Sequence, residues 1–372
     1  MPSLLFHSVR IPALTSSLFL LPKVRLANTR LCNLSALMAS SAVGINSPSS
    51  LVLCGKSPTE NEIAKSIKSN NTLKLPDDGE TSISLQSELD NKAFKEGSFG
   101  IDSFMNSLTT DKFGRFLIWS PRLSSTHDVV SHNFCELPIG TVCVADVQTK
   151  GRGRSKNVWE SPLGCLLFSF TLQMEDGRVV PLVQYVVSLA ITEAVKDICD
   201  SNGLPSVDVK IKWPNDLYLN GLKVGGILCT STYKSKKFNV SAGIGLNVNN
   251  EKPTTCLDTG LRGLSVEAYQ FQREDILAAF FNKFEKFYNL FVNEGFQTLE
   301  QLYYKTWLHS GQRVIVQEKK NEDKVIEHVV TIQGLTSTGY LLAVGDDNQM
   351  YELHPDGNSF DFFKGLVRRK LE

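Results

Sequence analysis

The segment "VDVKIKWPNDLYLNGLKVGGIL" (residues 207–228) holds the clearest local signals for the fold of this chain. From 207 to 213 every second residue is apolar, which predicts a strand with one buried face. Asn220 and Gly221 then separate two apolar runs, and this pair is the strongest short-range signal for a two-residue type I′ hairpin. The segment therefore predicts neighbouring antiparallel strands.

Further strands and two long helices surround this segment. Apolar runs that predict strands lie at 113–120, 140–147, 165–172 and 238–249. One helix opens at Pro181 and stops at Gly203. A second helix spans 273–293, and its apolar stripe consists of Ile276, Phe280, Phe284, Phe287 and Phe291. This mixture predicts an α+β domain with a mixed, mostly antiparallel sheet.

Domain boundaries follow from changes in this pattern. Residues 113–308 form the predicted main domain, and the short strands and turns after His309 suit a small β-barrel or sandwich over 309–372. Residues 46–112 are polar and interrupted, so we expect an irregular extension with one short helix near 60–68.

Residues 1–45 have the composition of a transit peptide for the chloroplast or the mitochondrion. No Asp or Glu occurs in residues 1–59, which are rich in Ser and Leu. The basic residues in the first part of this stretch are Arg10, Lys23, Arg25 and Arg30. A secretory signal is the alternative, but its apolar run is broken by Pro12 and Pro22. Met38 could serve as a second start that yields a cytosolic product.

The balance of charge limits the partners of the chain. It has 39 basic and 39 acidic residues, so no overall field attracts nucleic acid or a membrane surface, and we predict neither as a partner. No apolar run reaches the roughly 20 residues of a membrane span. The eight cysteines are scattered without a CxxC pair and are expected to be reduced and mostly buried. His127 and His132 lack zinc-site spacing, and we interpret them as histidines on a helix surface.

The loop "QTKGRGRSKNVWESPLG" (148–164) carries basic residues at alternate positions, namely Lys150, Arg152, Arg154 and Lys156. Because the chain is neutral overall, we expect this loop to serve a local anion. Gly151 and Gly153 would let backbone N–H groups approach that anion. Taken alone, a short Gly/Arg motif is more often a solvated basic loop.

Four segments in this order resemble the biotin–protein ligases, also called holocarboxylase synthetases. They are "SST" (124–126), the loop from Gln148 to Trp159, "KWPNDLYLNGLKVGGIL" (212–228) and "GIGLNVN" (243–249). Each segment alone has an ordinary structural explanation, such as an N-cap, a turn or a glycine-bearing strand. The resemblance implies a class II synthetase-like biotinyl/lipoyl ligase domain followed by an SH3-like β-barrel.

The resemblance also implies a two-step reaction. Biotin and ATP first give biotinyl-5′-AMP and pyrophosphate, and biotin then passes to one lysine of a biotin carboxyl carrier domain in a biotin-dependent carboxylase. Two unit charges about 4 Å apart repel by roughly 4 kcal/mol at an effective dielectric of 20, so a carboxylate that attacks a phosphate needs nearby cations. Mg²⁺ is expected with ATP, although no set of protein metal ligands is visible in the sequence.

The family's site residues can be assigned to positions of this sequence. Catalytic roles are implied for Lys223, Asp216 and Arg154. Asp216 would accept a proton from the acceptor lysine, whose reference pKa is about 10.4. Biotin is expected against Ser125, Thr126, His127, Gln148, Gly151, Arg152, Gly153, Arg154, Lys223, Gly225 and Gly226. ATP or the adenylate is expected against Arg152, Arg154, Trp159, Lys212, Asn215 and Asn247.

The chain also departs from the family pattern. Residue 127 is His where Asn is frequent, which leaves its role open. After "GRGR" the loop continues with Ser155-Lys156-Asn157-Val158, so a third arginine is absent. No helix-turn-helix pattern precedes residue 113, so regulation of DNA is not expected.

Three other functions are alternatives to biotin ligation. A lipoate or octanoate ligase or transferase would share the fold, but "GRGRSKNVW" with "KWPND" and "GLKVGGIL" favours biotin. A nucleic-acid-binding module could use the Arg/Gly loop, but the neutral charge counts against it. An inactive scaffold would require that Arg152, Arg154 or Lys223 be replaceable without loss of ligation. The sequence does not indicate the oligomeric state or the acceptor proteins.

Overall fold

The computed structural model describes residues 49–75, 81–89, 97–154, 157–250, 252–266, 268–321, 324–355, 358–361 and 364–369. The predicted transit peptide (1–45), with Met38 inside it, lies outside these residues. Ser155 and Lys156 of the basic loop lie outside them as well.

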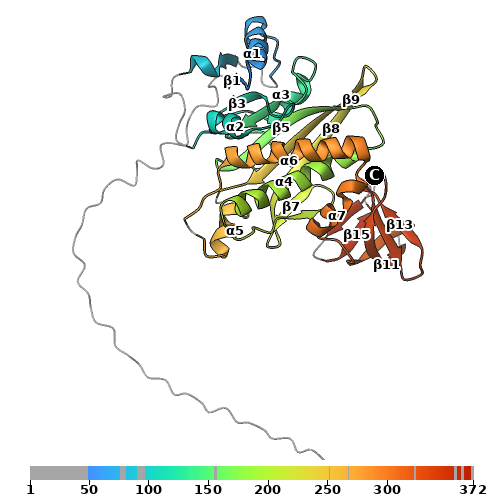
Figure 1. Cartoon of the computed structure of the whole chain (residues 1–372). Helices are drawn as coiled ribbons and strands as arrows, with labels where there is room; N and C mark the ends of the chain where they lie inside the picture. The colour runs from blue at the N-terminus through green and yellow to red at the C-terminus, as the bar shows by residue number, and fades with distance from the viewer. Residues whose placement is uncertain are drawn as a thin grey trace, which may run out of the picture. The chain divides into compact units, whose positions relative to one another are not determined.

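A nine-stranded mixed sheet forms the main domain (Figure 1). Its strands are β1 (Ser49–Gly55), β2 (Thr81–Leu85), β3 (Phe116–Ser120), β4 (Val142–Ala145), β5 (Cys165–Met174), β6 (Lys210–Lys212), β7 (Asp216–Leu219), β8 (Leu222–Lys234) and β9 (Lys237–Asn247). They lie side by side in the order β2-β1-β3-β4-β5-β9-β8-β7-β6. The pairs β1/β2 and β3/β4 are parallel, and the other neighbours are antiparallel. The prediction of a mixed, mostly antiparallel sheet is confirmed.

Helices cover both faces of this sheet. They are α1 (Pro58–Asn70), α2 (Ile101–Ser107), α3 (Thr126–His132), α4 (Val183–Ser201), α5 (Leu257–Gly263), α6 (Arg273–Glu294) and α7 (Gln297–Thr306), with 3₁₀ turns at Gln86–Glu88 and Val180–Leu182. On one face α4 and α6 pack together, as Figure 1 shows. On the other face α1 and α3 cover a second core. Alternate residues of β3 point to the two cores, since Leu117 belongs to the first and Ile118 to the second.

The predicted apolar stripe on α6 is buried, apart from the partly buried Phe287. Phe280 packs on Phe168 of β5 with ring centroids 5.2 Å apart. Phe284 packs on Phe170 of the same strand at 5.0 Å. Such edge-to-face aromatic pairs add about 0.5–1.5 kcal/mol each to the burial of their area. The pairs hold β5 in the middle of the sheet, next to the strands that line the candidate site.

The hairpin predicted from Asn220 and Gly221 is present. Both residues have positive φ, 50° and 79°, as a type I′ turn requires, and they join β7 to β8. The alternate apolar residues from 207 to 213 are also buried, although only Lys210–Lys212 pair as strand β6.

The interpretation of residues 46–112 as an irregular extension is wrong for the residues that the structure describes. β1 lies between β2 and β3, and its Leu51 and Leu53 are fully buried. The helix expected near 60–68 is α1, and at its start the Glu60 carboxylate accepts from the backbone N–H of Ser57 at 2.6 Å. β1 was missed because its antiparallel partner β3 begins about sixty residues later, so no local pattern announces the pairing.

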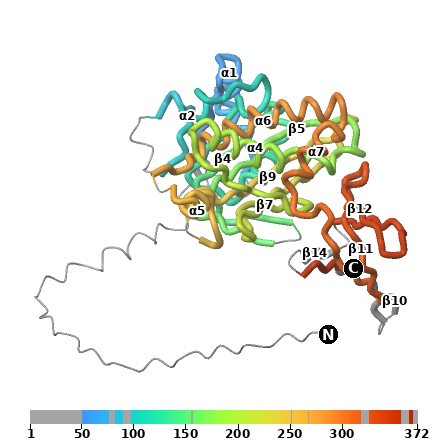
Figure 2. Tube along the Cα trace, turned by 60° about the horizontal axis from the view of Figure 1, so that its bottom comes forward, coloured from blue at the N-terminus to red at the C-terminus, as the bar shows by residue number. Residues whose placement is uncertain are grey.

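The C-terminal domain contains six described strands that form one sheet. They are β10 (Arg313–Asn321), β11 (Lys324–Leu335), β12 (Leu341–Gly345), β13 (Met350–Leu353), β14 (Asn358–Asp361) and β15 (Leu366–Arg369), in the order β13-β12-β11-β10-β15-β14. Figure 2 shows these strands gathered after α7. The SH3-like barrel itself stays a prediction.

No helix within the described ranges is long and apolar enough to cross a membrane. The cysteines of these ranges are free; most are buried, whereas Cys135 is exposed and Cys229 is half-buried. Burial raises the pKa of the Cys54 and Cys165 thiols to about 12, so both are protonated at neutral pH.

Candidate active site

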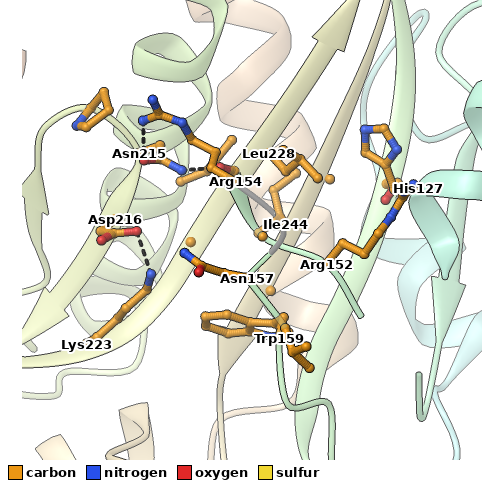
Figure 3. A pocket seen from close by; sticks show the side chains of 18 of the residues that line it. His127, Arg152, Arg154, Asn157, Trp159, Asn215, Asp216, Lys223, Leu228 and Ile244 are labelled. Carbon is orange, nitrogen blue, oxygen red and sulfur yellow. Dashed lines mark hydrogen bonds and ion pairs between the residues drawn. The ribbon is translucent and has the colours of Figure 1, made fainter. Parts of the chain in front are cut away.

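A cavity of about 400 Å³ collects most of the residues that the sequence singled out (Figure 3). Most of its lining comes from α3, from the loop 148–164, and from β7, β8 and β9, with further residues from β5, β6 and the C-terminal domain. The predicted site residues that line it are Ser125, Thr126, His127, Gln148, Arg152, Gly153, Arg154, Trp159, Lys212, Asn215, Asp216, Lys223 and Gly226.

An ion pair between Lys223 and Asp216 stands at one side of the pocket, with Lys223 Nζ 2.6 Å from Asp216 Oδ1 (Figure 3). The ion pair crosses the β7–β8 hairpin diagonally, because Asp216 stands opposite Gly226 and Lys223 stands opposite Tyr218. Lys223 Nζ also lies 5.5 Å from the centroid of the Trp159 ring. Both side chains remain partly exposed, so the ammonium group can meet an anionic ligand while the hairpin holds its backbone.

Two glycines of β9 allow side chains to lie directly against the strand. A Cβ atom at residue 245 would overlap the indole of Trp159. A Cβ atom at residue 243 would come within 3.0 Å of Cδ2 of His127. The Nε1 of Trp159 is buried, and it has no hydrogen-bond partner in the described part of the chain. The edge of the indole that carries Nε1 therefore lies against β9 beside Gly245.

A neutral hydrogen-bond network occupies another part of the wall. The backbone N–H and the hydroxyl of Thr126 both lie within hydrogen-bond distance of Gln148 Oε1, at 2.8 and 3.0 Å. The Thr126 hydroxyl is also 2.8 Å from Ser169 Oγ, and Gln148 Nε2 donates to Ser161 Oγ at 3.2 Å. Ser125 caps α3 by accepting from the backbone of Asp128. This wall thus offers uncharged donors and acceptors, in contrast to the cations elsewhere.

His127 is buried in the pocket wall, so its interpretation as a helix-surface residue is wrong, whereas His132 is exposed as expected. The reason is that α3 packs against β5 and β9, which turns the residue after Thr126 toward the sheet. Nε2 of His127 lies 3.1 Å from Thr230 Oγ1. Burial, with a smaller effect of the Arg152 charge, lowers the pKa of His127 to about 4. Its imidazole is therefore neutral at physiological pH.

The basic loop folds into a short hairpin over the pocket. Arg152 and Val158 form an antiparallel bridge, and Gly153 N donates to Asn157 O at 2.8 Å. Trp159 N donates to Gly151 O at 2.9 Å. Such pairing would hold the two arginines and the tryptophan at fixed positions relative to one another.

The two arginines of the loop have different partners. Arg152 forms an ion pair with Asp128, the third residue of α3. Arg154 Nη1 donates to Asn215 Oδ1 at 3.1 Å, and its Nη2 donates to the backbone oxygen of Pro355 at 3.3 Å. The Arg154 side chain therefore connects the loop, the "KWPND" segment and the C-terminal domain.

The structure does not bring every predicted residue to this pocket. Gly151 lines an adjoining cavity. At Gly225 a Cβ atom would meet Gly245 O at 3.0 Å, so its open face packs on β9 rather than on free space. Asn247 is fully buried, and its amide donates to Thr255 O at 2.9 Å. The role of Asn247 at the adenylate stays a prediction, whereas its contacts here are structural.

Several lining residues were missed by the sequence analysis. They are Asn157, Val158, Ser169, Trp213, Pro214, Ile227, Leu228, Gly243, Ile244, Gly245 and Pro355. The glycines at 243 and 245 stand two apart on a strand, so this spacing could have placed them on one face. Pro355 comes from the second domain and carries no local signal of its position.

Within the described ranges, no group of three or more His, Cys, Asp or Glu side chains could hold a metal ion.

Comparison with known proteins defines the class first. Residues 119–247 match the Biotin/lipoate A/B protein ligase family, and residues 309–365 match the Biotin protein ligase C terminal domain. The first match contains nearly the whole pocket, and the second contains Pro355. The fold is thus that of a ligase class that includes both biotin and lipoate enzymes.

Individual relatives within this class are biotin–protein ligases. Biotin–protein ligase 1, chloroplastic, of Arabidopsis thaliana is 69% identical over 339 residues, which cover 91% of this chain and 92% of the relative. Biotin–protein ligase 2 of the same plant is 69% identical over 328 residues, 88% of this chain and 99% of the relative. A solved mutant biotin protein ligase from Aquifex aeolicus in complex with biotin has a TM-score of 0.50 at 26% identity, and covers 64% of this chain and 94% of that chain.

The chain belongs to the biotin–protein ligase family. It is accordingly an enzyme, and the resemblance stated from the sequence is confirmed. Neither the lipoate-ligase alternative nor the nucleic-acid-binding alternative is favoured by these relatives.

Proposed function

We propose that this protein uses ATP to attach biotin to a lysine of a biotin carboxyl carrier domain, through biotinyl-5′-AMP. The observation that carries this proposal is the composition of the pocket. Arg152, Arg154 and Lys223 supply cations, while Thr126 and Gln148 supply a neutral network of donors and acceptors. Biotin has a matching division, because its ureido head is polar and uncharged and its tail ends in a carboxylate.

In the first step the cations would reduce the repulsion between the biotin carboxylate and the α-phosphate of ATP. Lys223 is held on a hairpin, so its charge needs little reorganisation when the phosphate arrives. Arg154 has a planar fork that suits a phosphate oxygen, and its position is fixed by Asn215. Closure of the loop over the adenylate would exclude water, which otherwise hydrolyses the mixed anhydride.

The nucleotide is proposed to lie beside Trp159, Lys212 and Asn215. The indole of Trp159 lines the pocket and offers a flat face for the adenine. Mg²⁺ would enter with ATP and supply charge neutralisation at the phosphates. It would be held mainly by phosphate oxygens and water, as Mg²⁺ usually is at nucleotide sites.

In the second step Asp216 would position the acceptor lysine and accept its proton. A free lysine is mostly protonated at neutral pH, and the ammonium form cannot attack the anhydride. In the present structure the Asp216 carboxylate is paired with Lys223. A phosphate bound to Lys223 would weaken that pair, which would free the carboxylate for the incoming lysine.

We also propose a cellular compartment and an acceptor protein for this reaction. The acid-free N-terminal stretch favours import into an organelle, and one relative at 69% identity is named chloroplastic. We therefore propose the chloroplast as the compartment of the protein and a biotin-dependent carboxylase as the acceptor. Fluorescent fusions of residues 1–45 would test this, because a mitochondrial or cytosolic signal would contradict it.

Adenylate formation is the measurement that tests the reaction. The purified full-length chain would be incubated with labelled ATP, Mg²⁺ and either biotin or lipoate, followed by an isolated carrier domain. We expect biotinyl-AMP and pyrophosphate to form with biotin and not with lipoate. Biotin should then be found on one lysine of the carrier domain. Activation of lipoate in place of biotin would show that the substrate is wrong, and no reaction with either acid would refute the site.

A further inference from the structure

The connection between the two domains runs along the edge strand of the main sheet. Trp307 forms a parallel bridge with Ile211 of β6, and Leu308 N donates to Ile211 O at 2.9 Å. Two residues further along both segments, the backbone N–H of Trp213 donates to Nε2 of His309 at 2.9 Å. The imidazole of His309 thus accepts a hydrogen bond where a strand carbonyl would otherwise do so.

The protonation state of His309 follows from its partners. Because the Trp213 backbone can only donate, Nε2 of His309 must be the acceptor and the proton must be on Nδ1. Nδ1 can then donate to Gln312 Oε1, which lies 3.0 Å away. Burial, with a smaller effect of the Lys212 charge, lowers the pKa of His309 to about 4. The imidazole is therefore neutral at physiological pH, as this hydrogen bond requires.

The side chain of Trp213 is held at its other polar atom as well. Its Nε1 donates to Tyr185 OH at 2.8 Å and approaches Gly339 O at 3.2 Å. Tyr185 OH in turn donates to Gly339 O at 2.5 Å. Both N–H groups of this buried tryptophan are thereby fixed, and two of their partners, His309 and Gly339, belong to the matched C-terminal domain.

Trp213 directly precedes the part of the pocket proposed to hold the nucleotide. Two residues on, Asn215 accepts from Arg154, and the next residue, Asp216, pairs with Lys223. We propose that His309 is a positioning residue for the ATP-dependent step, because its neutral imidazole fixes the backbone that carries Asn215 and Asp216. This inference rests on the proposed function. His309 itself does not line the pocket.

Three variants of the full-length chain test the inference. In His309→Gln the amide oxygen can reach the place of Nε2, whereas in His309→Asn the shorter side chain cannot. His328→Gln makes the same chemical change in the C-terminal domain at a residue whose Nδ1 faces Tyr351 OH instead. Steady-state pyrophosphate release would be measured against ATP and against biotin for each variant.

We expect His309→Asn to lower kcat/KM for ATP at least about tenfold, with the KM for ATP raised, since small displacements of reacting groups are costly. The KM for biotin should stay within about twofold, because the neutral network lies on other elements. His309→Gln should recover kcat/KM for ATP to within about threefold of the wild type, and His328→Gln should match the wild type. A general loss of folded protein would lower kcat alone and leave both KM values unchanged.

Thermal unfolding would show whether His309→Asn is folded. If it is not, Gln312→Leu takes its place in the test. Gln312→Leu removes the acceptor that orients the imidazole, and we expect it to raise the KM for ATP about threefold. An unchanged KM for ATP in folded His309→Asn, or in Gln312→Leu where His309→Asn does not fold, would overturn the inference alone, as would equal kinetics for His309→Asn and His309→Gln. Absence of biotinyl-AMP with the wild-type chain would instead overturn the proposed function.

Discussion

Lys223 is the residue on which the proposed chemistry depends most. It is the pocket cation that pairs with Asp216 and also lies over Trp159. We expect Lys223→Met to lower kcat for adenylate formation by about 10²–10³, the usual cost of losing one preorganised charge at a reacting group. Lys237→Met is the control, because Lys237 pairs loosely with the exposed Glu175 and should change kcat less than twofold. Comparable rates of pyrophosphate release in both variants would contradict this role.

Gly245 gives a second prediction at the scale of one residue. A methyl group there would overlap the indole of Trp159, so Gly245→Ala should displace the proposed nucleotide platform. Overpacking of this kind costs about 1–3 kcal/mol, so we expect the KM for ATP to rise about tenfold. Gly263→Ala is the matched control, since its Cβ would meet nothing within 4 Å. ATP titrations of both variants would decide, and a normal KM in Gly245→Ala would refute the platform.

The burial of His127 could not be predicted from the residues around it in the sequence. The sequence placed it correctly at the start of a helix, because Ser125 is a recognisable N-cap. Its burial depends on β9, more than a hundred residues away, where Gly243 leaves room for the ring. Packing between distant segments decides such cases, and local pattern contains no record of it.

Among the helices and strands, those with the most local sequence signals were predicted best. The Asn220–Gly221 turn needs only two residues with positive φ, so its hairpin and the position of Lys223 followed directly from the sequence. The α6 stripe repeats over many turns and was equally clear. β1 was missed since it is seven residues long and pairs with strands on either side that lie far along the chain.

The burial of β1 makes a prediction about stability. Leu53 is 1% exposed in the core beneath α1 and α3, so Leu53→Ala should reduce the free energy of unfolding by about 2–4 kcal/mol. Leu222→Ala removes the same atoms at a half-exposed site and should cost much less. Urea unfolding of the two variants would measure the difference. Equal stabilities would show that residues 49–55 do not belong to the core in solution.

At the scale of the whole molecule, the site is shared by two domains in a way that the sequence did not predict. The four motif segments supplied most of the pocket lining because each motif lies within the main domain. Pro355 and His309 contribute from beyond residue 308, and neither stands in a recognisable motif. The sequence could place a second domain after the first, but contacts between domains have no periodicity from which to read them.

The same junction predicts how stability changes with pH. His309 has its pKa lowered from 6.5 to about 4 in the folded protein, so the unfolded chain binds a proton there before the folded chain does. The free energy of unfolding should therefore fall as pH decreases from about 6.5 to about 4, by up to about 3 kcal/mol from this residue. His127 adds a change of the same sign, but it is present in the wild type and in a His309→Gln variant alike.

A comparison of the wild type with His309→Gln isolates the contribution of His309 to the pH dependence of stability. Denaturant unfolding at pH 7 and at pH 4.5 should show that His309→Gln loses less stability on acidification than the wild type, because glutamine does not titrate. His328→Gln should lose as much as the wild type, since it leaves the Trp213 contact in place. Parallel losses in the wild type and in His309→Gln would mean that His309 is already accessible to protons in the folded protein. In that case the imidazole could not serve as the permanent acceptor that joins the C-terminal domain to the pocket.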